Sequence, residues 1–222
     1  MNRGVEKRDI FLKNQDYSRF ILALELFNTR SEINIWQLIA RAGTVPARTR
    51  LEAQRNQKHE AIVELMAFTL MPNHYHLIVR EIVEGGIGLF MKKLGGYSTY
   101  FNKQYNRVGS LLQSRYKAVK ITNDAQLTNT FCYVHTNPVG LWERGWKNFT
   151  VANSPAAINK LQHYRWSSYN DYIGVPQFPA LTRREFFIQR FGNPETCKQF
   201  IEDWVAFKAK TIELDPKIIN FC

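Results

Sequence analysis

The sequence predicts an α+β protein, in which an antiparallel sheet carries helices on one face and a helical extension follows at the C-terminus. Two strand-like stretches, residues 60–70 and 75–80, flank the turn residues Pro72-Asn73 and are expected to pair as antiparallel neighbours. Apolar residues at helical spacing before and after this hairpin predict the helices. Hydrophobic residues make up 45% of the 222-residue chain, which is enough for a folded core.

Two helices are predicted around the hairpin. An apolar stripe predicts a helix over residues 16–27. Gly85-Gly86 break the chain before a second helix, which the spacing predicts as one continuous element over residues 87–105. Residues 31–58 are polar and basic, and either extend a hairpin or form a loop that touches DNA.

The end of the first domain is predicted from turn and cap residues. Residues 116–121 are apolar enough for a strand or for the end of a helix. Asn123 or Asp124 is expected to cap a helix that Asn137-Pro138 ends. We also expect a structural role for its His135, which lies near the helix C-terminus, where positive charge is favoured.

The remaining chain has a different character. We expect a first domain over residues 1–140 and an extension over residues 141–222. The extension begins with an aromatic-rich connector of little periodicity and continues with helices over residues 182–191 and 194–208.

Two histidines stand at the start of the second strand-like stretch, His74 and His76, with Tyr75 between them. Side chains alternate along a strand, so both imidazoles are expected on one face. Two imidazoles on a rigid strand form half of a divalent-metal site. The alternatives are a packing pair between strands or an ordinary core histidine.

A basic and aromatic tract runs from residue 85 to residue 123 without one Asp or Glu. Cations neutralise phosphates and rings stack on bases, so this mixture is typical of proteins that bind single-stranded nucleic acid. The net charge of +11 indicates a polyanionic partner too. The alternative is a solvated basic face over core aromatics. The cations expected to contact nucleic acid are Lys92, Lys93, Lys103, Arg107, Arg115, Lys117 and Lys120.

Other classes of protein are not indicated. No apolar run approaches the ~20 residues of a membrane span, and the N-terminus lacks the apolar segment of a signal peptide. Cys132, Cys197 and Cys222 are widely spaced and odd in number, which indicates neither a disulfide framework nor a zinc site. We therefore expect a cytoplasmic monomer or homodimer with no membrane partner.

Several short motifs follow one another along roughly residues 2–172. They are Asn2-Arg3-Gly4 with Asp9-Ile10-Phe11, then Met71-Pro72-Asn73-His74-Tyr75-His76-Leu77, then Gly109-Ser110-Leu111-Leu112-Gln113-Ser114-Arg115-Tyr116-Lys117, then Tyr133-Val134-His135-Thr136-Asn137-Pro138, then Trp166-Ser167-Ser168-Tyr169. In this order they resemble the REP-associated tyrosine transposases, an IS200-like branch of the HUH single-strand transposases.

The resemblance implies a ferredoxin-like (HUH) fold whose central strand carries the metal-binding histidines His74 and His76, with Mg²⁺ or Mn²⁺ as cofactor. It also implies a tyrosine nucleophile on a nearby helix, and cleavage and rejoining of single-stranded or hairpin (REP-like) DNA. By its place in the motif the nucleophile is Tyr116. Its alternatives are Tyr97, Tyr100 and Tyr105, and a structural or phosphate-contacting role for Tyr116 also stays open.

The chemistry of these residue types agrees with that reading. A tyrosine hydroxyl has a reference pKa of ~10 and is a poor nucleophile unless a nearby group activates it. A divalent ion on the two histidines would polarise the scissile phosphate and neutralise developing charge. Attack by tyrosine yields a 5′-phosphotyrosine that retains the energy of the broken linkage, so rejoining needs no nucleotide cofactor. The chain accordingly has no Gly-x-x-x-x-Gly-Lys loop.

Two departures from the family pattern leave rival functions open. The family's first strand normally precedes the Asn2-Arg3-Gly4 segment, so the start is truncated or that sheet edge is missing. Lys120 stands where a third metal ligand is expected, with Gln113, Asn123 and Asp124 as substitutes. The rivals are a sequence-specific DNA-binding protein that has lost the chemistry, and a metal-dependent phosphodiesterase that activates water.

Overall fold

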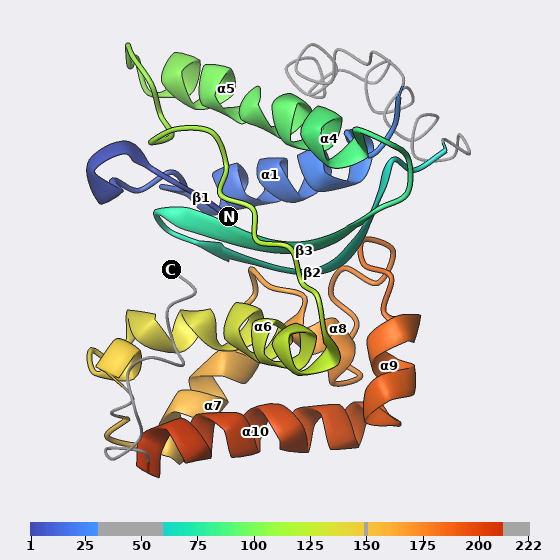
Figure 1. The fold of residues 1–222 in the computed structure, drawn as a ribbon. Coiled ribbons are helices and arrows are strands. Elements are labelled where there is room, and N and C mark those ends of the chain that lie inside the picture. Colours follow the sequence, from blue (N-terminus) through green and yellow to red (C-terminus); the bar gives the residue numbers. More distant parts are fainter. Residues whose placement is uncertain (31–59, 149–150, 211–222) are drawn as a thin grey trace. The chain divides into compact units, whose positions relative to one another are not determined.

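The computed structural model describes residues 1–30, 60–148 and 151–210 (Figure 1). The chain forms two compact units. Unit 1 comprises Met1–Lys120 with Ala180–Arg183, and unit 2 comprises Ile121–Pro179 and the residues from Arg184 onward. This division falls after Lys120, whereas the sequence analysis placed a domain boundary after residue 140. The hairpin extension or DNA-contacting loop predicted for residues 31–58 lies outside the described residues.

Unit 1 is built on a three-stranded antiparallel sheet in the order β1-β3-β2. The strands are β1 (Asn2–Arg3), β2 (Val63–Met71) and β3 (His74–Glu81). The central strand β3 pairs with β2 along its whole length and with β1 at its beginning. The α+β class and the hairpin around Pro72-Asn73 are therefore confirmed.

A fourth, irregular segment runs along the other edge of β1. Leu112 forms a bridge with Gly4, the Gln113 N–H donates to the Arg3 carbonyl (2.9 Å), and the Lys117 N–H donates to the Met1 carbonyl (2.9 Å). The order of strand, helix, two strands, helices and strand-like segment is that of a βαββαβ domain. The sequence analysis left open a truncated start or a missing sheet edge, and in the structure residues 112–117 run along the edge of β1. The strand or helix end predicted at residues 116–121 is wrong, because the edge contacts replace a regular element there.

Three helices cover one face of this sheet: α1 (Asn14–Leu26), α4 (Gly86–Gly95) and α5 (Tyr97–Gln104) (Figure 1). Phe20 of α1 lies at the centre of their contact. Its ring centroid is 4.8 Å from that of Tyr75 on β3 and 5.2 Å from that of Tyr97 on α5. The continuous helix predicted over residues 87–105 is wrong, because it divides at Gly96, where glycine lowers the stability of a continuous helix.

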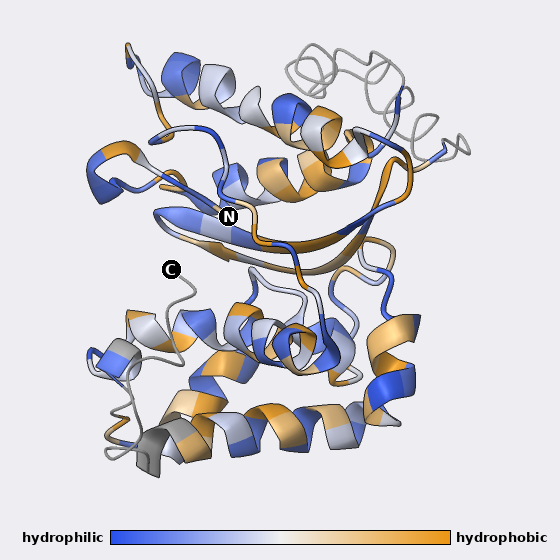
Figure 2. Cartoon of the chain, in the orientation of Figure 1, coloured by the Kyte–Doolittle hydropathy of each residue, from blue (hydrophilic) through white to orange (hydrophobic). Residues whose placement is uncertain are grey.

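Hydropathy along the hairpin changes where β3 begins. Figure 2 shows hydrophobic colours along the middle of β2 and β3 and hydrophilic colours at the turn that joins them. The sequence accounts for this change, because Asn73, His74, Tyr75 and His76 follow one another there. Polar side chains are therefore concentrated at one end of an otherwise apolar sheet.

Unit 2 is helical. Asn123 caps its first helix by accepting a hydrogen bond from the Gln126 N–H (2.8 Å), as predicted for one of two candidate cap residues. Its core is aromatic: the ring centroid of Phe131 lies 4.9 Å from that of Tyr172 and 4.2 Å from that of Phe187. The helices are α6 (Asp124–Thr136), α7 (Ser154–Gln162), α8 (Tyr169–Tyr172), α9 (Glu185–Phe191) and α10 (Pro194–Lys210), and short 3₁₀ turns lie at Val5–Lys7 in unit 1 and at Asn137–Leu141 and Trp146–Asn148 in unit 2.

The connector of unit 2 contains a helix that the sequence analysis did not predict. Helix α7 lies within the aromatic-rich stretch after residue 140. Asn153 caps it by accepting a hydrogen bond from the Ala156 N–H (2.9 Å), and Pro155 occupies its first turn. None of the helices in the described part of the chain is long and apolar enough to cross a membrane.

Candidate metal and nucleic-acid site

Strand β3 presents His74 and His76 on one face of the sheet. Tyr75, between them, packs on Phe20 under the helices, so the two imidazoles point to the other face. Their ring centroids are 5.0 Å apart and the rings are nearly perpendicular, at 83°. Both side chains are buried.

The loop that follows β1 holds the hairpin turn in place. The Gly4 N–H donates to the Asn73 carbonyl (2.8 Å), and the Ile10 N–H donates to the Pro72 carbonyl (2.7 Å). Glycine is required here, because a Cβ on Gly4 would lie 2.2 Å from the Arg8 carbonyl oxygen. The Asn2-Arg3-Gly4 segment and the histidine hairpin are therefore one structural unit, although about seventy residues separate them in the sequence.

The hairpin also orients the histidines and sets their protonation. Asn73 Oδ1 lies 2.6 Å from His74 Nδ1 and holds that ring by a hydrogen bond. Burial lowers the pKa of His76 well below its ordinary value, and the nearby charges of His74 and Arg3 lower the pKa further. His76 is consequently neutral near pH 7, which is the form that binds a metal ion.

The chemistry of this pair fits half of a divalent-metal site. Two imidazoles on one face of a strand, one of them held by an amide oxygen, match the arrangement in which an outer group orients a histidine ligand. No cluster of three or more His, Cys, Asp and Glu side chains occurs among the described residues. The remaining ligands of a bound ion would then be amide, water or phosphate oxygens.

The substitutes considered for a third ligand have other roles. Asn123 caps α6 through its side-chain oxygen, and Asp124 forms an ion pair with Arg190 at 3.0 Å. The Gln113 side chain is exposed, and its backbone N–H donates to the Arg3 carbonyl of β1. Lys120 is exposed as well, and a charged ammonium group cannot bind a metal ion.

Three of the tyrosines considered as nucleophiles form hydrogen bonds within unit 1. The Tyr97 hydroxyl donates to the Ile10 carbonyl (2.6 Å), and those of Tyr100 and Tyr105 donate to Asp16 (3.0 and 2.7 Å). Burial raises the pKa of all three hydroxyls, to about 12 for Tyr100. A higher pKa makes the reactive phenolate scarcer, so these tyrosines are poorly suited to attack a phosphate.

Tyr116 has a different environment. It is partly exposed, and no described residue forms a hydrogen bond with its hydroxyl. Its neighbour Lys117 bonds to Met1 through both its N–H and its carbonyl. The backbone at Tyr116 is thus two strand spacings from β3, roughly 10 Å. It lies in unit 1 with the histidines, but on an irregular segment and not on a helix.

The sequence analysis did not consider Tyr133 as a nucleophile. This tyrosine is partly exposed and lies on the regular helix α6 of unit 2. A signal was available, because Tyr133 begins one of the motifs that carry the family resemblance and the resemblance implies a nucleophile on a helix. Arg3 was also passed over, although it is the cross-strand partner of His74.

The structure divides the basic residues into two groups. The ammonium group of Lys93 donates to the Thr29 carbonyl, and Arg107 donates to Asn102 Oδ1 (3.0 Å), so both are bonded within the fold. The rings of Phe90, Tyr97 and Phe101 are buried, as the alternative of core aromatics predicts. Exposed cations are Lys92, Lys103, Arg115, Lys117 and Lys120.

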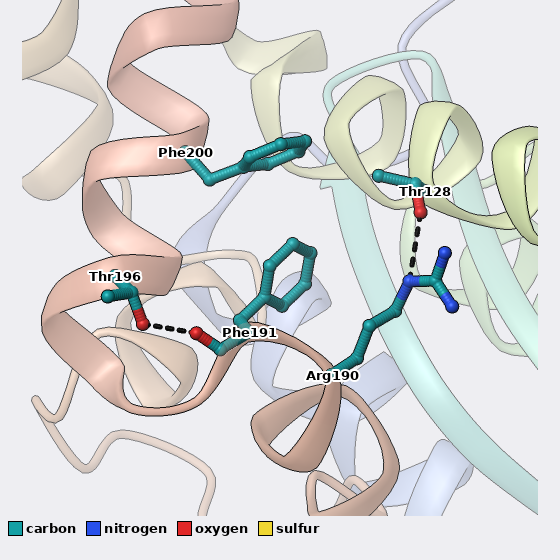
Figure 3. A pocket seen from close by; sticks show the side chains of 5 residues that line it. All are labelled: Thr128, Arg190, Phe191, Thr196 and Phe200. Atoms are coloured by element: carbon teal, nitrogen blue, oxygen red, sulfur yellow. Dashed lines mark hydrogen bonds between the residues drawn. The ribbon is translucent and has the colours of Figure 1, made fainter.

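A separate open pocket of about 440 Å³ lies within unit 2 (Figure 3). The rings of Phe191 and Phe200 line it, together with Thr128, Thr196 and Arg190. Arg190 donates to Thr128 Oγ1 (3.1 Å) and forms the ion pair with Asp124. With its one cation already paired, and neither histidine nor carboxylate in its lining, this pocket lacks the groups needed for phosphoryl transfer.

A comparison with known families adds an independent finding. Residues 45–137 match the family model described as "Transposase IS200 like". The matched segment contains both histidines, Tyr116, Tyr133 and all seven predicted nucleic-acid contacts. No curated protein and no solved structure matches the chain significantly.

Proposed function

Given that this match supports its assignment to the IS200-like transposase family and a role in DNA transposition, we propose that the chain cleaves and rejoins single-stranded DNA at hairpin (REP-like) sites through a 5′-phosphotyrosine. The observation that carries the proposal is the placement of His74 and His76, side by side on one face of β3 within the matched segment. The cofactor is Mg²⁺ or Mn²⁺ on these histidines.

The protein's own groups carry out most of this reaction. The bound ion supplies polarisation of the scissile phosphate. The tyrosine oxygen forms a bond to phosphorus and loses its proton, while the bond from phosphorus to the 3′ oxygen breaks and that oxygen leaves as a hydroxyl after taking up a proton. The reverse attack rejoins the strand. The exposed cations hold the strand through its phosphates.

The proposal names Tyr116 as nucleophile and Tyr133 as the second candidate. Tyr116 is supported by its place in the motif, its hydroxyl free of described hydrogen bonds, and its location in unit 1 beside β1. Tyr133 is supported by its position on a helix within the matched segment. Each tyrosine can be tested separately, because Tyr→Phe removes one oxygen and keeps the ring.

The test is a denaturing gel of the protein incubated with single-stranded hairpin DNA and Mn²⁺, followed by peptide mass mapping of the adduct. We expect Tyr116→Phe to abolish the covalent complex while hairpin affinity survives, and Tyr164→Phe to serve as the unaffected control. Loss of the adduct in Tyr133→Phe alone would move the nucleophile to α6. Multiple-turnover cleavage by a variant that carries both Tyr116→Phe and Tyr133→Phe would instead support the phosphodiesterase that activates water.

The histidines are tested in the same assay. His74→Ala combined with His76→Ala should abolish cleavage and leave most of the hairpin affinity, because affinity comes mainly from phosphate contacts. The exposed His163 provides the matched control, His163→Ala. Cleavage by the double variant, or cleavage unaffected by EDTA, would contradict the metal role.

A DNA-binding protein without catalysis is the second candidate function. It is favoured by the absence, among the described residues, of a third His, Cys, Asp or Glu beside the histidine pair. This rival predicts tight hairpin binding with no covalent adduct under Mg²⁺ or Mn²⁺.

A further inference from the structure

Arg3 lies beside the histidine pair, on the neighbouring strand. In the pairing of β1 with β3, Arg3 is directly opposite His74 and Asn2 is opposite Tyr75. Residues directly opposite each other share a face of the sheet, with Cβ atoms about 5 Å apart. The Arg3 side chain therefore lies on the histidine face.

The Arg3 guanidinium has no bonding partner among the described residues, and part of it is buried. Its Nε atom is inaccessible to solvent and forms no hydrogen bond, and the group forms no ion pair with a described carboxylate. Three other described arginines form ion pairs: Arg8 with Glu6, Arg80 with Glu64 and Arg190 with Asp124. A donor left unsatisfied away from water costs free energy, which an incoming acceptor would recover.

The backbone of Arg3 is fixed at both of its polar groups. Its N–H donates to Asn2 Oδ1 (2.8 Å), and its carbonyl accepts from the Gln113 N–H (2.9 Å). The next residue, Gly4, is bonded to the hairpin turn and packed against Arg8. The guanidinium consequently projects from a rigid strand, so no backbone freedom would be lost when it binds an anion.

We propose that Arg3 is a positioning residue that binds a phosphate of the DNA strand held over His74 and His76. A guanidinium presents paired N–H donors that match two oxygens of one phosphate. This inference rests on the proposed function for the identity of the anion as a phosphodiester. It adds an anion contact, supplied by β1, to the histidine face.

The proposal also explains why a cation sits beside residues that would hold a metal ion. Arg3 repels a positive ion at the histidine pair as long as no anion is present. A bound phosphate removes that repulsion, so the strand and the ion favour each other's binding. Arg3→Gln should therefore tighten Mn²⁺ binding to the DNA-free protein, which calorimetry can measure without any cleavage.

The decisive experiment measures binding of an oligothymidylate to the full chain in EDTA, over a range of salt concentrations. Arg3→Gln should weaken binding roughly tenfold and reduce the slope of log K against log salt by about 0.7, the effect of one lost contact to a single strand. Arg3→Lys should leave the salt slope unchanged but lower the affinity for the oligothymidylate in part. Lysine keeps the positive charge but lacks the paired N–H donors of the guanidinium.

Two controls separate a phosphate contact from a structural role. Arg80→Gln, at an arginine of the same sheet that is already paired with Glu64, should leave the slope unchanged. An uncharged methylphosphonate oligothymidylate should bind wild type and Arg3→Gln alike. Equal slopes for Arg3→Gln and Arg80→Gln would overturn the proposal, and so would a wild-type protein that binds no single strand. The assay needs neither metal nor cleavage, so a missing tyrosine adduct with an intact Arg3 effect would refute only the proposed chemistry.

Discussion

A single carboxylate, Asp16, organises the helix-covered side of unit 1. Its side chain is 1% exposed and accepts hydrogen bonds from the Leu12 and Lys13 N–H groups (2.9 and 3.0 Å). The hydroxyls of Tyr100 and Tyr105 donate to the same carboxylate from α5 and the residue that follows it. Asp16 thus joins the start of α1 to residues more than eighty positions later, among them two of the tyrosines considered as nucleophiles.

Replacing this carboxylate tests its importance for stability. Asp16→Asn should lower the free energy of unfolding by about 1–3 kcal/mol, because an amide accepts fewer hydrogen bonds and leaves buried donors unsatisfied. Denaturant unfolding measures the change. Asp9→Asn, at an exposed carboxylate nearby, should shift stability by less than about 0.5 kcal/mol. Equal effects of the two substitutions would refute the structural role.

At the scale of elements, a buried histidine lies near the end of helix α6. The sequence analysis expected a structural role for His135 near the helix C-terminus, and its burial agrees with that role. The side chain is fully buried, its Nε2 lies 2.8 Å from Ser168 Oγ, and its ring centroid is 4.3 Å from that of Phe131. Burial lowers the pKa of His135 to about 3, so the imidazole is neutral near pH 7.

This burial predicts how stability depends on pH. The unfolded chain takes up a proton at His135 below a pKa near 6.5, while the folded chain does so only near 3. Folding stability is therefore full above pH 6.5 and falls as the pH is lowered from 6.5 towards 3, by ~1.4 kcal/mol per pH unit. His135→Gln should remove about 2 kcal/mol of the stability lost between pH 7 and pH 5.

Urea unfolding at both pH values gives the measurement. The comparison is between the variant and wild type, so contributions from other titrating groups such as His76 cancel. His163→Gln, at an exposed position, is the control and should follow wild type. An unchanged pH dependence in His135→Gln would show that the buried imidazole does not control acid stability.

At the scale of the whole molecule, the net charge of +11 attracts a polyanion, but individual cations contribute differently. Lys92 and Lys103 are exposed, whereas the ammonium group of the adjacent Lys93 bonds to the Thr29 carbonyl. Two adjacent lysines thus differ: the side chain of Lys92 is exposed to solvent, and that of Lys93 is bonded within the fold. Only the exposed members are well placed to meet phosphates.

The contribution of exposed and of bonded lysines to DNA binding can be tested separately. Lys92→Gln with Lys103→Gln should weaken single-strand binding and reduce the salt slope by about 1.4, which corresponds to two lost phosphate contacts. Lys93→Gln should leave the slope nearly unchanged and lower thermal stability instead. Fluorescence titrations at several salt concentrations and a melting curve separate the two effects. A slope that responds to Lys93 and not to the other two lysines would reverse the assignment.

The sequence by itself determined those features that depend on neighbours along the chain. Alternation along β3 places His74 and His76 on one face, the Pro72-Asn73 turn joins the hairpin, and a cap at Asn123 or Asp124 begins α6, because each needs only residues a few positions away. The resemblance to IS200-like transposases came from such short motifs, and the family match supports it.

Only the tertiary structure decided features that join distant segments. Arg3 meets His74 across some seventy residues, and Asp16 binds Tyr100 and Tyr105 across more than eighty. Local patterns carry no information about such pairs, because strand order and helix packing bring them together. Tertiary packing also decides the state of a side chain: positive charge is favoured at the helix end where His135 lies, but burial within unit 2 lowers the pKa of its imidazole, which is neutral near pH 7.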